Sequence, residues 1–168
     1  MGPYVDTPSR TLADGSHQAI GGLSTGAFGA ANIALLHPNM FGYVLGLSGT
    51  DLAVRPWTGK ALWHGEKAVK ADNRPARYAP RVSGTAWLPF CLIVGGSDNL
   101  DDTLHQTRQF DAVLAKLRVP HVADYFPGRH SWIVWRLHAV DALEYVGQGA
   151  GLNPRGDNMS PTEGASVP

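Results

Sequence analysis

"AIGGLSTGAFGAANIALLHP", residues 19–38, changes character at a serine in its middle. The stretch begins as a short apolar strand, breaks at glycines around Ser24, and continues with the spacing of an alanine-rich helix. Gly22, Ser24 and Gly26 form a G-x-S-x-G pattern at that break. A strand that turns directly into a helix at such a pattern is typical of a nucleophilic serine held on a tight turn.

The small residues around Ser24 have a steric explanation if the serine is a nucleophile. Such a turn strains the backbone, and larger side chains at Gly22 and Gly26 would collide with the adjacent strand and helix. The same run of small residues includes Gly21, Ala27 and Gly29. The alternative is an ordinary Gly/Ser turn, because this pattern also occurs by chance. Its position between an apolar strand and a helix favours the nucleophile.

Apolar segments alternate with helical patterns along the rest of the chain. We expect strands at residues 17–23, 41–49, 89–96 and 121–126. Helices are expected from residue 25 to about residue 37, at 99–118 and at 131–146. Crossovers of this length require parallel pairing. The sequence therefore predicts an α/β fold, with helices on both faces of a parallel sheet of about four strands.

The segments outside this pattern set the expected domain boundaries. Residues 50–88 are irregular and rich in Trp, Pro and Gly, which indicates a long insertion of the kind that builds substrate pockets. Residues 147–168 are predicted to form a disordered tail. One domain is expected over residues 1–146, because a chain of 168 residues is too short for two ordinary cores.

Charge and composition argue against several kinds of partner. Fourteen basic residues balance fourteen acidic ones without a basic run, so we expect no nucleic-acid partner. No stretch approaches the length of apolar sequence that spans a bilayer. The histidines lack ligand spacing with carboxylates or cysteine, so no metal is assigned. Cys91 lies in the apolar segment "PFCLIVGG" and is expected to be a buried hydrophobic residue.

A nucleophilic serine needs a base and an orienting acid, and two later strand ends can supply them. Asp98 follows the strand at 89–96 in "IVGGSDN", and His130 follows the strand at 121–126 in "FPGRHSW". Parallel strands connected by crossovers end at the same edge of their sheet. We therefore expect Ser24, Asp98 and His130 to meet at that edge.

Both assignments leave alternatives open. Asp98 could instead cap the following helix, and Asp101 or Asp102 would then be the acid. We favour Asp98 because it is closest to the strand end, although His130 could also be an ordinary loop histidine. The other histidines are expected to be structural or exposed: His17, His37, His64, His105, His121 and His138.

Three segments together resemble the esterase family of α/β-hydrolases, which includes esterase D, feruloyl esterases and the secreted mycolyltransferases of actinobacteria. They are "AIGGLSTGAFGAANIALLHPNMFGYVLGLSG", "IVGGSDN" and "PGRHSWIVWRLHAVDAL", and the resemblance covers about residues 4–146. By motif, it implies that Ser24 is the nucleophile, Asp98 the acid and His130 the base. It also implies that the backbone N–H of Thr25 is one oxyanion donor.

The chain departs from the family pattern ahead of the serine turn. Family members carry several strands and the second oxyanion donor before this turn, whereas a short segment precedes Ser24 here. We therefore expect a partial α/β-hydrolase fold that corresponds to the C-terminal portion of the family's domain. Its first strand, at residues 17–23, would be an apolar edge open to pairing.

The residues and the resemblance together predict a serine esterase or acyltransferase that needs no cofactor. Its substrate would be a small-molecule, glycan or lipid ester. The expected pocket is lined by aromatic residues: Trp57, Trp63, Tyr78, Trp87 and Trp132. The alternatives are a catalytically silent hydrolase fragment and a carbohydrate- or lipid-binding module. The family resemblance favours a location outside the cytoplasm.

Overall fold

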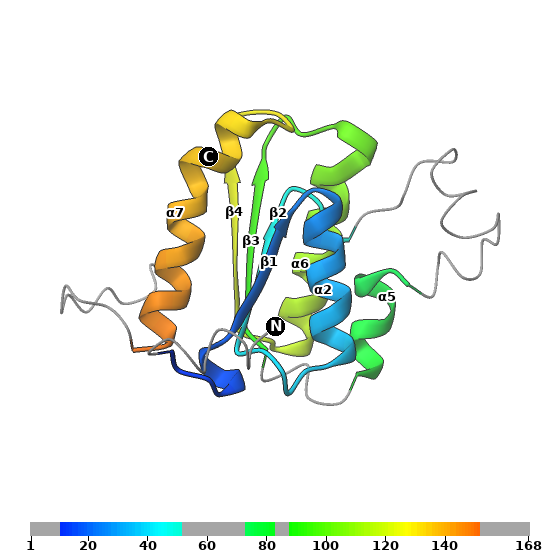
Figure 1. The fold of residues 1–168 in the computed structure, drawn as a ribbon. Coiled ribbons are helices and arrows are strands. Elements are labelled where there is room, and N and C mark those ends of the chain that lie inside the picture. The colour runs from blue at the N-terminus through cyan, green and yellow to red at the C-terminus, as the bar shows by residue number, and fades with distance from the viewer. Residues whose placement is uncertain (1–10, 52–72, 83–87, 152–168) are drawn as a thin grey trace.

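The computed structural model describes residues 11–51, 73–82 and 88–151, which form one parallel sheet with helices on both faces (Figure 1). The strands are β1 (Ala19–Leu23), β2 (Tyr43–Leu47), β3 (Phe90–Gly95) and β4 (His121–Phe126). The main helices are α2 (Thr25–Leu36), α6 (Thr103–Leu117) and α7 (Trp132–Gly149). Shorter helical segments are α5 (Pro75–Tyr78) and the 3-10 turns η1 (Gly15–His17), η2 (Ala79–Arg81) and η4 (Leu100–Asp102).

The strands lie side by side in the order β1-β2-β3-β4, and each neighbouring pair is parallel. Ala19 is opposite Tyr43 in the first pair, and Cys91 is opposite Val122 in the last. All four carboxyl ends therefore reach the same edge of the sheet, at the top of Figure 1. The predicted α/β fold with about four parallel strands is confirmed.

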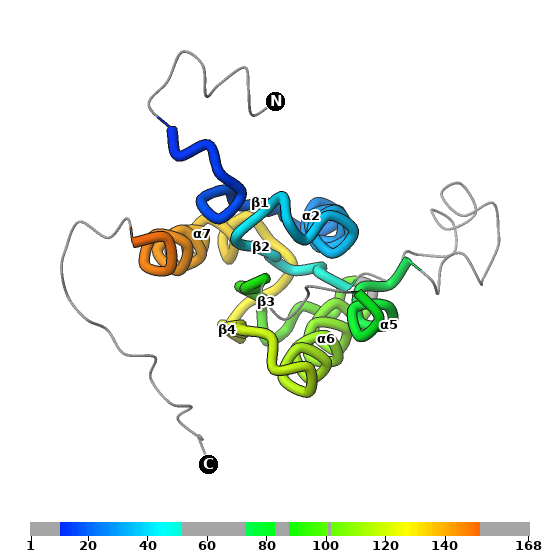
Figure 2. The backbone as a smooth tube through the Cα atoms, turned by 90° about the horizontal axis from the view of Figure 1, so that it is seen from below, coloured from blue at the N-terminus to red at the C-terminus, as the bar shows by residue number. Residues whose placement is uncertain are grey.

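Alternate residues of the central strands enter two apolar clusters, one on each face of the sheet. On one face, Val44 and Phe90 pack with residues of α2 and α6. On the other face, Leu45 and Cys91 pack with Trp135 and other residues of α7. Figure 2 shows α7 on one side of the sheet and α2, α5 and α6 on the other. Because both faces are covered, β2 and β3 are buried along their whole length.

Two helices differ from their predicted bounds. The segment predicted as one helix over 99–118 begins with the turn η4, because Asp102 has a left-handed backbone with a φ of 64°. The last helix continues through three residues of the predicted tail and ends at Gly149. The rest of that predicted tail, from residue 152, lies outside the described residues.

A buried ion pair ties the loop after β2 to the start of α5. Arg74 Nη2 lies 2.5 Å from Asp51 Oδ2, and the backbone N–H of Ala76 donates to Asp51 Oδ1 (2.9 Å). The Asp51 side chain is fully buried, whereas that of Arg74 is one-quarter exposed. Desolvation raises the pKa of Asp51, although the bonds from Ala76 and Arg74 oppose the shift. This contact joins Asp51, near the start of the predicted insertion, to residues 74–76 later in the same insertion.

Replacing Arg74 with methionine should destabilise the fold by about 3 kcal/mol at neutral pH, because it leaves a buried carboxylate without its counter-charge. The pKa of Asp51 is raised in the folded state, so protonation removes that charge as the pH falls through this value. The deficit, measured by urea unfolding at several pH values, should be full where Asp51 of the variant is ionised and should shrink as the pH falls and this carboxyl is protonated. The exposed Arg77, changed to methionine, serves as the control and should stay within about 0.5 kcal/mol of wild type. A deficit independent of pH would contradict the role of Asp51.

Candidate active site

Ser24 stands between β1 and α2 with a backbone conformation that few serines adopt. Its φ is 53° and its ψ is −121°, and a positive φ is uncommon for residues other than glycine. Its N–H donates to Leu47 O (2.8 Å), which ties the turn to the end of β2. Its carbonyl oxygen accepts hydrogen bonds from the N–H groups of Ala27 (3.0 Å) and Phe28 (3.3 Å) at the start of α2. These bonds hold the serine in its strained position at the helix N-terminus.

Among the glycines of this turn, Gly22 has no space for a side chain. A Cβ on Gly22 would lie 2.5 Å from Gly26 O and 2.8 Å from Ala27 N, so β1 and α2 meet backbone to backbone here. The expectation that Gly26 and Gly29 also relieve crowding is wrong. Among the described residues, nothing lies within 4 Å of a Cβ on either, because both lie on the side of α2 opposite its buried alanines.

Ser24, His130 and Asp98 form a continuous series of hydrogen-bonding contacts at the carboxyl edge of the sheet. His130 Nε2 is 2.9 Å from Ser24 Oγ. His130 Nδ1 is 3.0 Å from Asp98 Oδ2 and 3.2 Å from Asp98 Oδ1. The Asp98 side chain is fully buried, and that of His130 is 13% exposed. When Nδ1–H donates to this carboxylate, Nε2 is the nitrogen that can accept the serine proton.

The loops that carry Asp98 and His130 approach each other closely enough to exclude side chains. A Cβ on Gly95 would lie 2.5 Å from Gly128 O. The N–H of Ser97 donates to the same carbonyl oxygen (2.9 Å). Gly128 has a φ of 143°, which favours glycine. The sequence analysis did not identify these glycines, which hold the acid and the imidazole within reach of each other.

Trp135 packs against the imidazole and was also missed by the sequence analysis. Its ring centroid lies 4.8 Å from that of His130, with the ring planes at 87°. Trp132 makes a similar edge contact with Trp135, at 5.3 Å. No spacing in the sequence indicates this contact, because it arises where the first turn of α7 packs against the loop that carries His130. His130 is thus held by a carboxylate on one side and an indole on another.

An apolar cavity of about 500 Å³ opens beside these residues. Leu23, which directly precedes the nucleophile candidate, and Trp135, which touches His130, both line it. Ser24 and His130 themselves are not among its lining residues. The other lining residues are Trp132, Ile133, Arg136 and Ala139. Trp132 was predicted as a pocket residue, and it is 72% exposed in this position.

Of the other predicted pocket residues, the structure describes Tyr78, which is not brought to this cavity. Tyr78 packs against the apolar cluster on the α2 face, and its hydroxyl donates to Asn32 Oδ1 (2.7 Å). Burial raises the pKa of Tyr78 well above its usual value. The structure thus gives Tyr78 a structural partner. Trp57, Trp63 and Trp87 lie outside the described residues.

Of the three candidate acids, Asp98 is the one whose carboxylate contacts His130. Asp102 is exposed, and it lines a separate polar cavity of about 330 Å³. Asp101 belongs to the η4 turn. Asp98 directly follows Ser97, whose N–H donates to Gly128 O.

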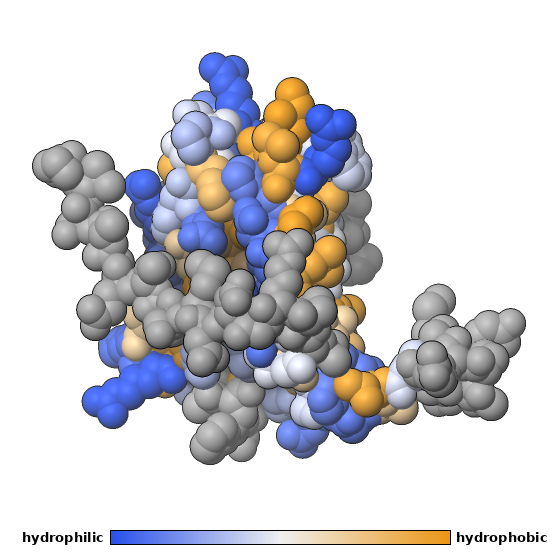
Figure 3. All heavy atoms as spheres, turned by 90° about the vertical axis from the view of Figure 1, so that its left-hand side faces the viewer, coloured by the Kyte–Doolittle hydropathy of each residue, from blue (hydrophilic) through white to orange (hydrophobic). Residues whose placement is uncertain are grey.

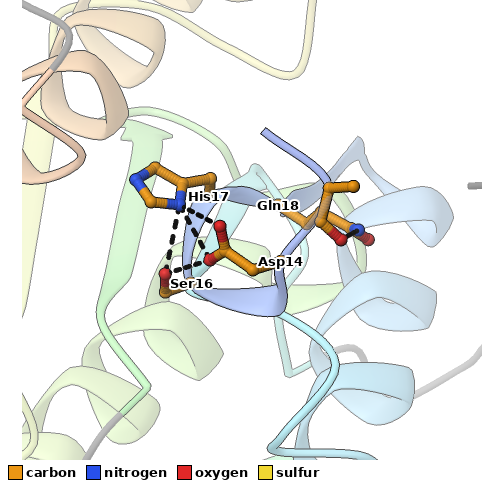
Figure 4. A network of polar contacts seen from close by, with 5 residues as sticks. Asp14, Ser16, His17 and Gln18 are labelled. Atoms are coloured by element: carbon orange, nitrogen blue, oxygen red, sulfur yellow. Dashed lines mark hydrogen bonds and ion pairs between the residues drawn. The ribbon is translucent and has the colours of Figure 1, made fainter. Parts of the chain in front are cut away.

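A second serine–histidine–aspartate group lies just before β1, at the end of the sheet where the strands begin, in and before η1 (Figure 4). His17 Nδ1 is 2.7 Å from both carboxylate oxygens of Asp14 and 3.2 Å from Ser16 Oγ. Ser16 Oγ also donates to Asp14. All these contacts of His17 use one ring nitrogen, so the imidazole cannot link the carboxylate to the hydroxyl through its two nitrogens. This group stabilises the chain before β1 instead.

Two further histidines among the described residues form pairs with carboxylates. His121 pairs with Asp111 (2.9 Å), and His138 pairs with Asp141 (2.9 Å). Desolvation raises the pKa of the buried Cys91 thiol to about 12. Within residues 11–51, 73–82 and 88–151, no group of three or more His, Cys, Asp or Glu side chains could hold a metal ion. None of the helices in these ranges is long and apolar enough to cross a membrane.

Comparison with known proteins identifies an esterase family. The family model described as "Putative esterase" matches residues 1–146, whereas curated protein sequences give no significant match. A solved ferulic acid esterase has a TM-score of 0.72 at 22% identity, over 88% of this chain and 56% of its own. The S-formylglutathione hydrolase of Agrobacterium tumefaciens has a TM-score of 0.70 at 19% identity, over 88% of this chain and 53% of its own.

A third solved structure is the fluorophosphonate-binding serine hydrolase F of Staphylococcus aureus, determined with substrate bound. Its TM-score is 0.69 at 20% identity, over 86% of this chain and 59% of its own. The TM-scores establish a shared fold. The chain spans little more than half the length of the solved structures it matches.

Gly22→Ala should destabilise the fold by about 1–3 kcal/mol, because the added methyl meets the backbone of Gly26 and Ala27. Gly26→Ala is the matched control. It should be neutral or stabilising by up to about 1 kcal/mol, because alanine is the better helix former. Urea unfolding of both variants measures the difference. Equal destabilisation would contradict the backbone contact at Gly22.

Gly95→Ala should separate the Asp98 loop from the His130 loop, because the methyl meets Gly128 O. We expect a loss of about 1–3 kcal/mol in urea unfolding and a shift of the His130 ring-proton resonances in NMR spectra. Gly96→Ala tests the neighbouring position, where a Cβ would make only an ordinary contact with Phe126 O at 3.4 Å. Its His130 resonances should stay in place. Unmoved resonances in Gly95→Ala would show that this contact does not position the imidazole.

Proposed function

This chain belongs to the esterase family, and we propose that it hydrolyses carboxylic esters, with Ser24 as nucleophile, His130 as general base and Asp98 as the orienting acid. The observation that carries the proposal is the pair of contacts made by the His130 ring. Nε2 lies 2.9 Å from Ser24 Oγ, and Nδ1 lies 3.0 Å from the Asp98 carboxylate. The apolar cavity lined by Leu23 and Trp135 gives an ester a place to bind.

The first half of the reaction forms an acyl-enzyme. Ser24 Oγ attacks the ester carbonyl carbon while its proton passes to His130 Nε2. The buried Asp98 carboxylate stabilises the imidazolium through Nδ1–H. The tetrahedral intermediate then collapses: the ester C–O bond breaks, and His130 returns the proton to the leaving alcohol. The acyl group remains bonded to Ser24.

The second half of the reaction releases the acyl group by the same steps. His130 removes a proton from an incoming hydroxyl, which attacks the acyl carbon, and then returns a proton to Ser24 Oγ. When water supplies the hydroxyl, the product is a free acid. When a sugar or lipid alcohol supplies it, the product is a new ester, and the chain acts as an acyltransferase.

The N-terminus of α2 supplies one donor for the oxyanion. Ser24 O accepts hydrogen bonds from the N–H groups of Ala27 and Phe28. The N–H groups of Thr25 and Gly26 come earlier in the helix, in its first turn. Groups at these positions have no acceptor within the helix. We assign Thr25 N–H as the donor, because it directly follows the nucleophile. One such donor contributes roughly 10²- to 10³-fold to the rate.

The lining of the cavity favours an ester with a compact apolar group. Trp132 and Trp135 meet edge to face in one wall, and Leu23 lies beside the nucleophile. Aromatic substrate rings pack well against such indole side chains. One structural neighbour is named for ferulic acid, which is an aromatic acid. Aryl esters are therefore the first substrates to test.

A second candidate function is a hydrolase fragment with no turnover of its own. The observation that favours it is length, because the solved structures extend well beyond the part that this chain matches. The other alternative from the sequence, a carbohydrate- or lipid-binding module, depends on the aromatic residues of the predicted insertion. Three of these, Trp57, Trp63 and Trp87, lie outside the described residues.

Hydrolysis of p-nitrophenyl acetate and p-nitrophenyl benzoate tests the proposal. Ser24→Ala and His130→Ala should each lower kcat by about 10³-fold or more, and Asp98→Ala by a smaller factor. Ser16→Ala removes the serine of the polar group before β1 and should leave kcat unchanged. Turnover by Ser24→Ala at the wild-type rate would refute the nucleophile. A folded wild-type chain without turnover would favour the fragment.

A further inference from the structure

A polar cavity of about 330 Å³ lies where the loops after β3 and β4 meet the start of α6. Its lining is rich in charged and polar side chains: Asp98, Asn99, Asp102, His105, Arg108 and Arg129. Of these, the proposed reaction uses Asp98 alone. The others form a group of ionisable and hydrogen-bonding side chains that ester hydrolysis does not explain.

This cavity differs in chemistry from the apolar cavity against α7. The apolar cavity is lined by Leu23 and by residues of α7 that include Trp132 and Trp135. Figure 3 views the α7 side and shows hydrophobic side chains gathered in a band over the upper part of the molecule. The helix α6 lies on the other side of the sheet (Figure 2). The polar cavity therefore suits a ligand of a different kind from an apolar ester group.

Arg108 reaches the polar cavity from α6 and is held by an aromatic ring. Its guanidinium carbon lies 5.4 Å from the centroid of the Tyr125 ring. The Tyr125 hydroxyl donates to Asp111 Oδ2 (2.7 Å), and Asp111 Oδ1 lies 2.9 Å from His121 Nε2. These contacts fix the ring beneath the guanidinium. The ring face occupies none of the five N–H donors that a guanidinium carries.

Arg129 reaches the same cavity from the loop before α7, directly ahead of His130. Among the described residues, the arginine that forms an ion pair is Arg74, so neither Arg108 nor Arg129 has a carboxylate partner there. A guanidinium group can donate two parallel hydrogen bonds to one carboxylate or phosphate. Two such groups, from separate elements and at one cavity, are suited to binding an oxyanion.

His105 supplies a further donor to this cavity. Arg74 Nη2 donates to Gln109 Oε1 (3.2 Å), and this orients the Gln109 amide so that its nitrogen donates to His105 Nε2 (2.8 Å). Because Nε2 accepts, Nδ1 is the ring nitrogen that carries the proton. His105 and Arg108 are three residues apart on α6 and therefore share one face of the helix.

Two carboxylates border the same cavity. The Asp98 side chain is fully buried, and its carboxylate contacts His130 Nδ1 at 3.0 Å. Asp102 is exposed and has a left-handed backbone. Asp98 is thus engaged by the imidazole, whereas Asp102 is the acid that opposes an incoming anion.

We propose that this cavity binds a small oxyanion, a phosphate or carboxylate group, through the guanidinium groups of Arg108 and Arg129, with His105 as a further donor. The volume of the cavity is at the lower end of the range for small-molecule sites. Charge-assisted hydrogen bonds from both guanidinium groups supply the affinity.

The bound oxyanion lies on the acid side of the proposed triad. His130 Nδ1 contacts Asp98 and Nε2 contacts Ser24, so the cavity borders the end of the series that is remote from the nucleophile. The ligand is therefore a separate molecule from the reacting ester. Its negative charge favours the charged imidazolium of His130, a consequence that rests on the proposed function.

NMR titration of the Ser24→Ala chain with inorganic phosphate tests the site, and this result does not depend on catalysis. Sodium chloride at matched ionic strength is the reference for nonspecific binding. We expect saturable shifts of the Asn99, His105 and Arg129 amide resonances, with a Kd of roughly 1–10 mM. Succinate is titrated in the same way, and the lower of the two Kd values shows whether a phosphate or a carboxylate is the preferred ligand.

Substitutions in the cavity should change the Kd in opposite directions. Arg108→Gln and Arg129→Gln should each raise it about tenfold, because each removes a charged, two-pronged donor. Asp102→Asn should lower it about threefold, because it removes a negative charge beside the site, and asparagine also tolerates a left-handed backbone. The exposed Arg77 of α5, changed to glutamine, is the matched control and should leave the Kd unchanged.

Several outcomes would overturn the site. They are shifts equal to those in sodium chloride, shifts confined to other parts of the chain, an Arg77→Gln variant that weakens binding as much as Arg108→Gln, and an Asp102→Asn variant with the wild-type Kd. Saturable binding that leaves the His130 ring-proton resonances in place would overturn only the consequence for the imidazole.

Discussion

The backbone of Gly95 touches the backbone of Gly128, and the position of His130 depends on that contact. It leaves no room for a Cβ, and the Ser97 N–H donates to the same carbonyl. The buried Asp98 carboxylate thereby comes within 3.0 Å of the imidazole, while Trp135 packs against the ring. The ring has little freedom to rotate away from Ser24. The packing of two loops and one helix thus positions these hydrogen-bonding side chains.

The turn at Ser24 places the serine hydroxyl next to that imidazole ring. Ser24 has a positive φ, and the bond from its N–H to Leu47 O holds it against the end of β2. Gly22 allows α2 to start in contact with β1. The parallel sheet then brings the three loops to one edge. Within the described residues, β1 pairs with β2 on one side and with no strand on the other.

Much of this arrangement could be predicted from the sequence. The strand at 121–126 has its predicted bounds, and Asp98 and His130 stand out because each follows an apolar strand. Their catalytic roles remain predictions. The contacts of Gly95 and Trp135 could not be predicted, because they arise between loops and helix faces that only the packed fold brings together. Gly26 was misjudged for a similar reason: the pattern shows that a residue is small, and not which side of the helix it occupies.

Intact-mass measurement after treatment with a fluorophosphonate tests the central claim most directly. The account predicts one adduct per chain, absent in Ser24→Ala and retained in Ser16→Ala. Among the serines that the structure describes, Ser24 is the one with an imidazole nitrogen placed to take its proton while the other nitrogen binds a carboxylate. A folded chain that forms no adduct, or an adduct that survives Ser24→Ala, would contradict it.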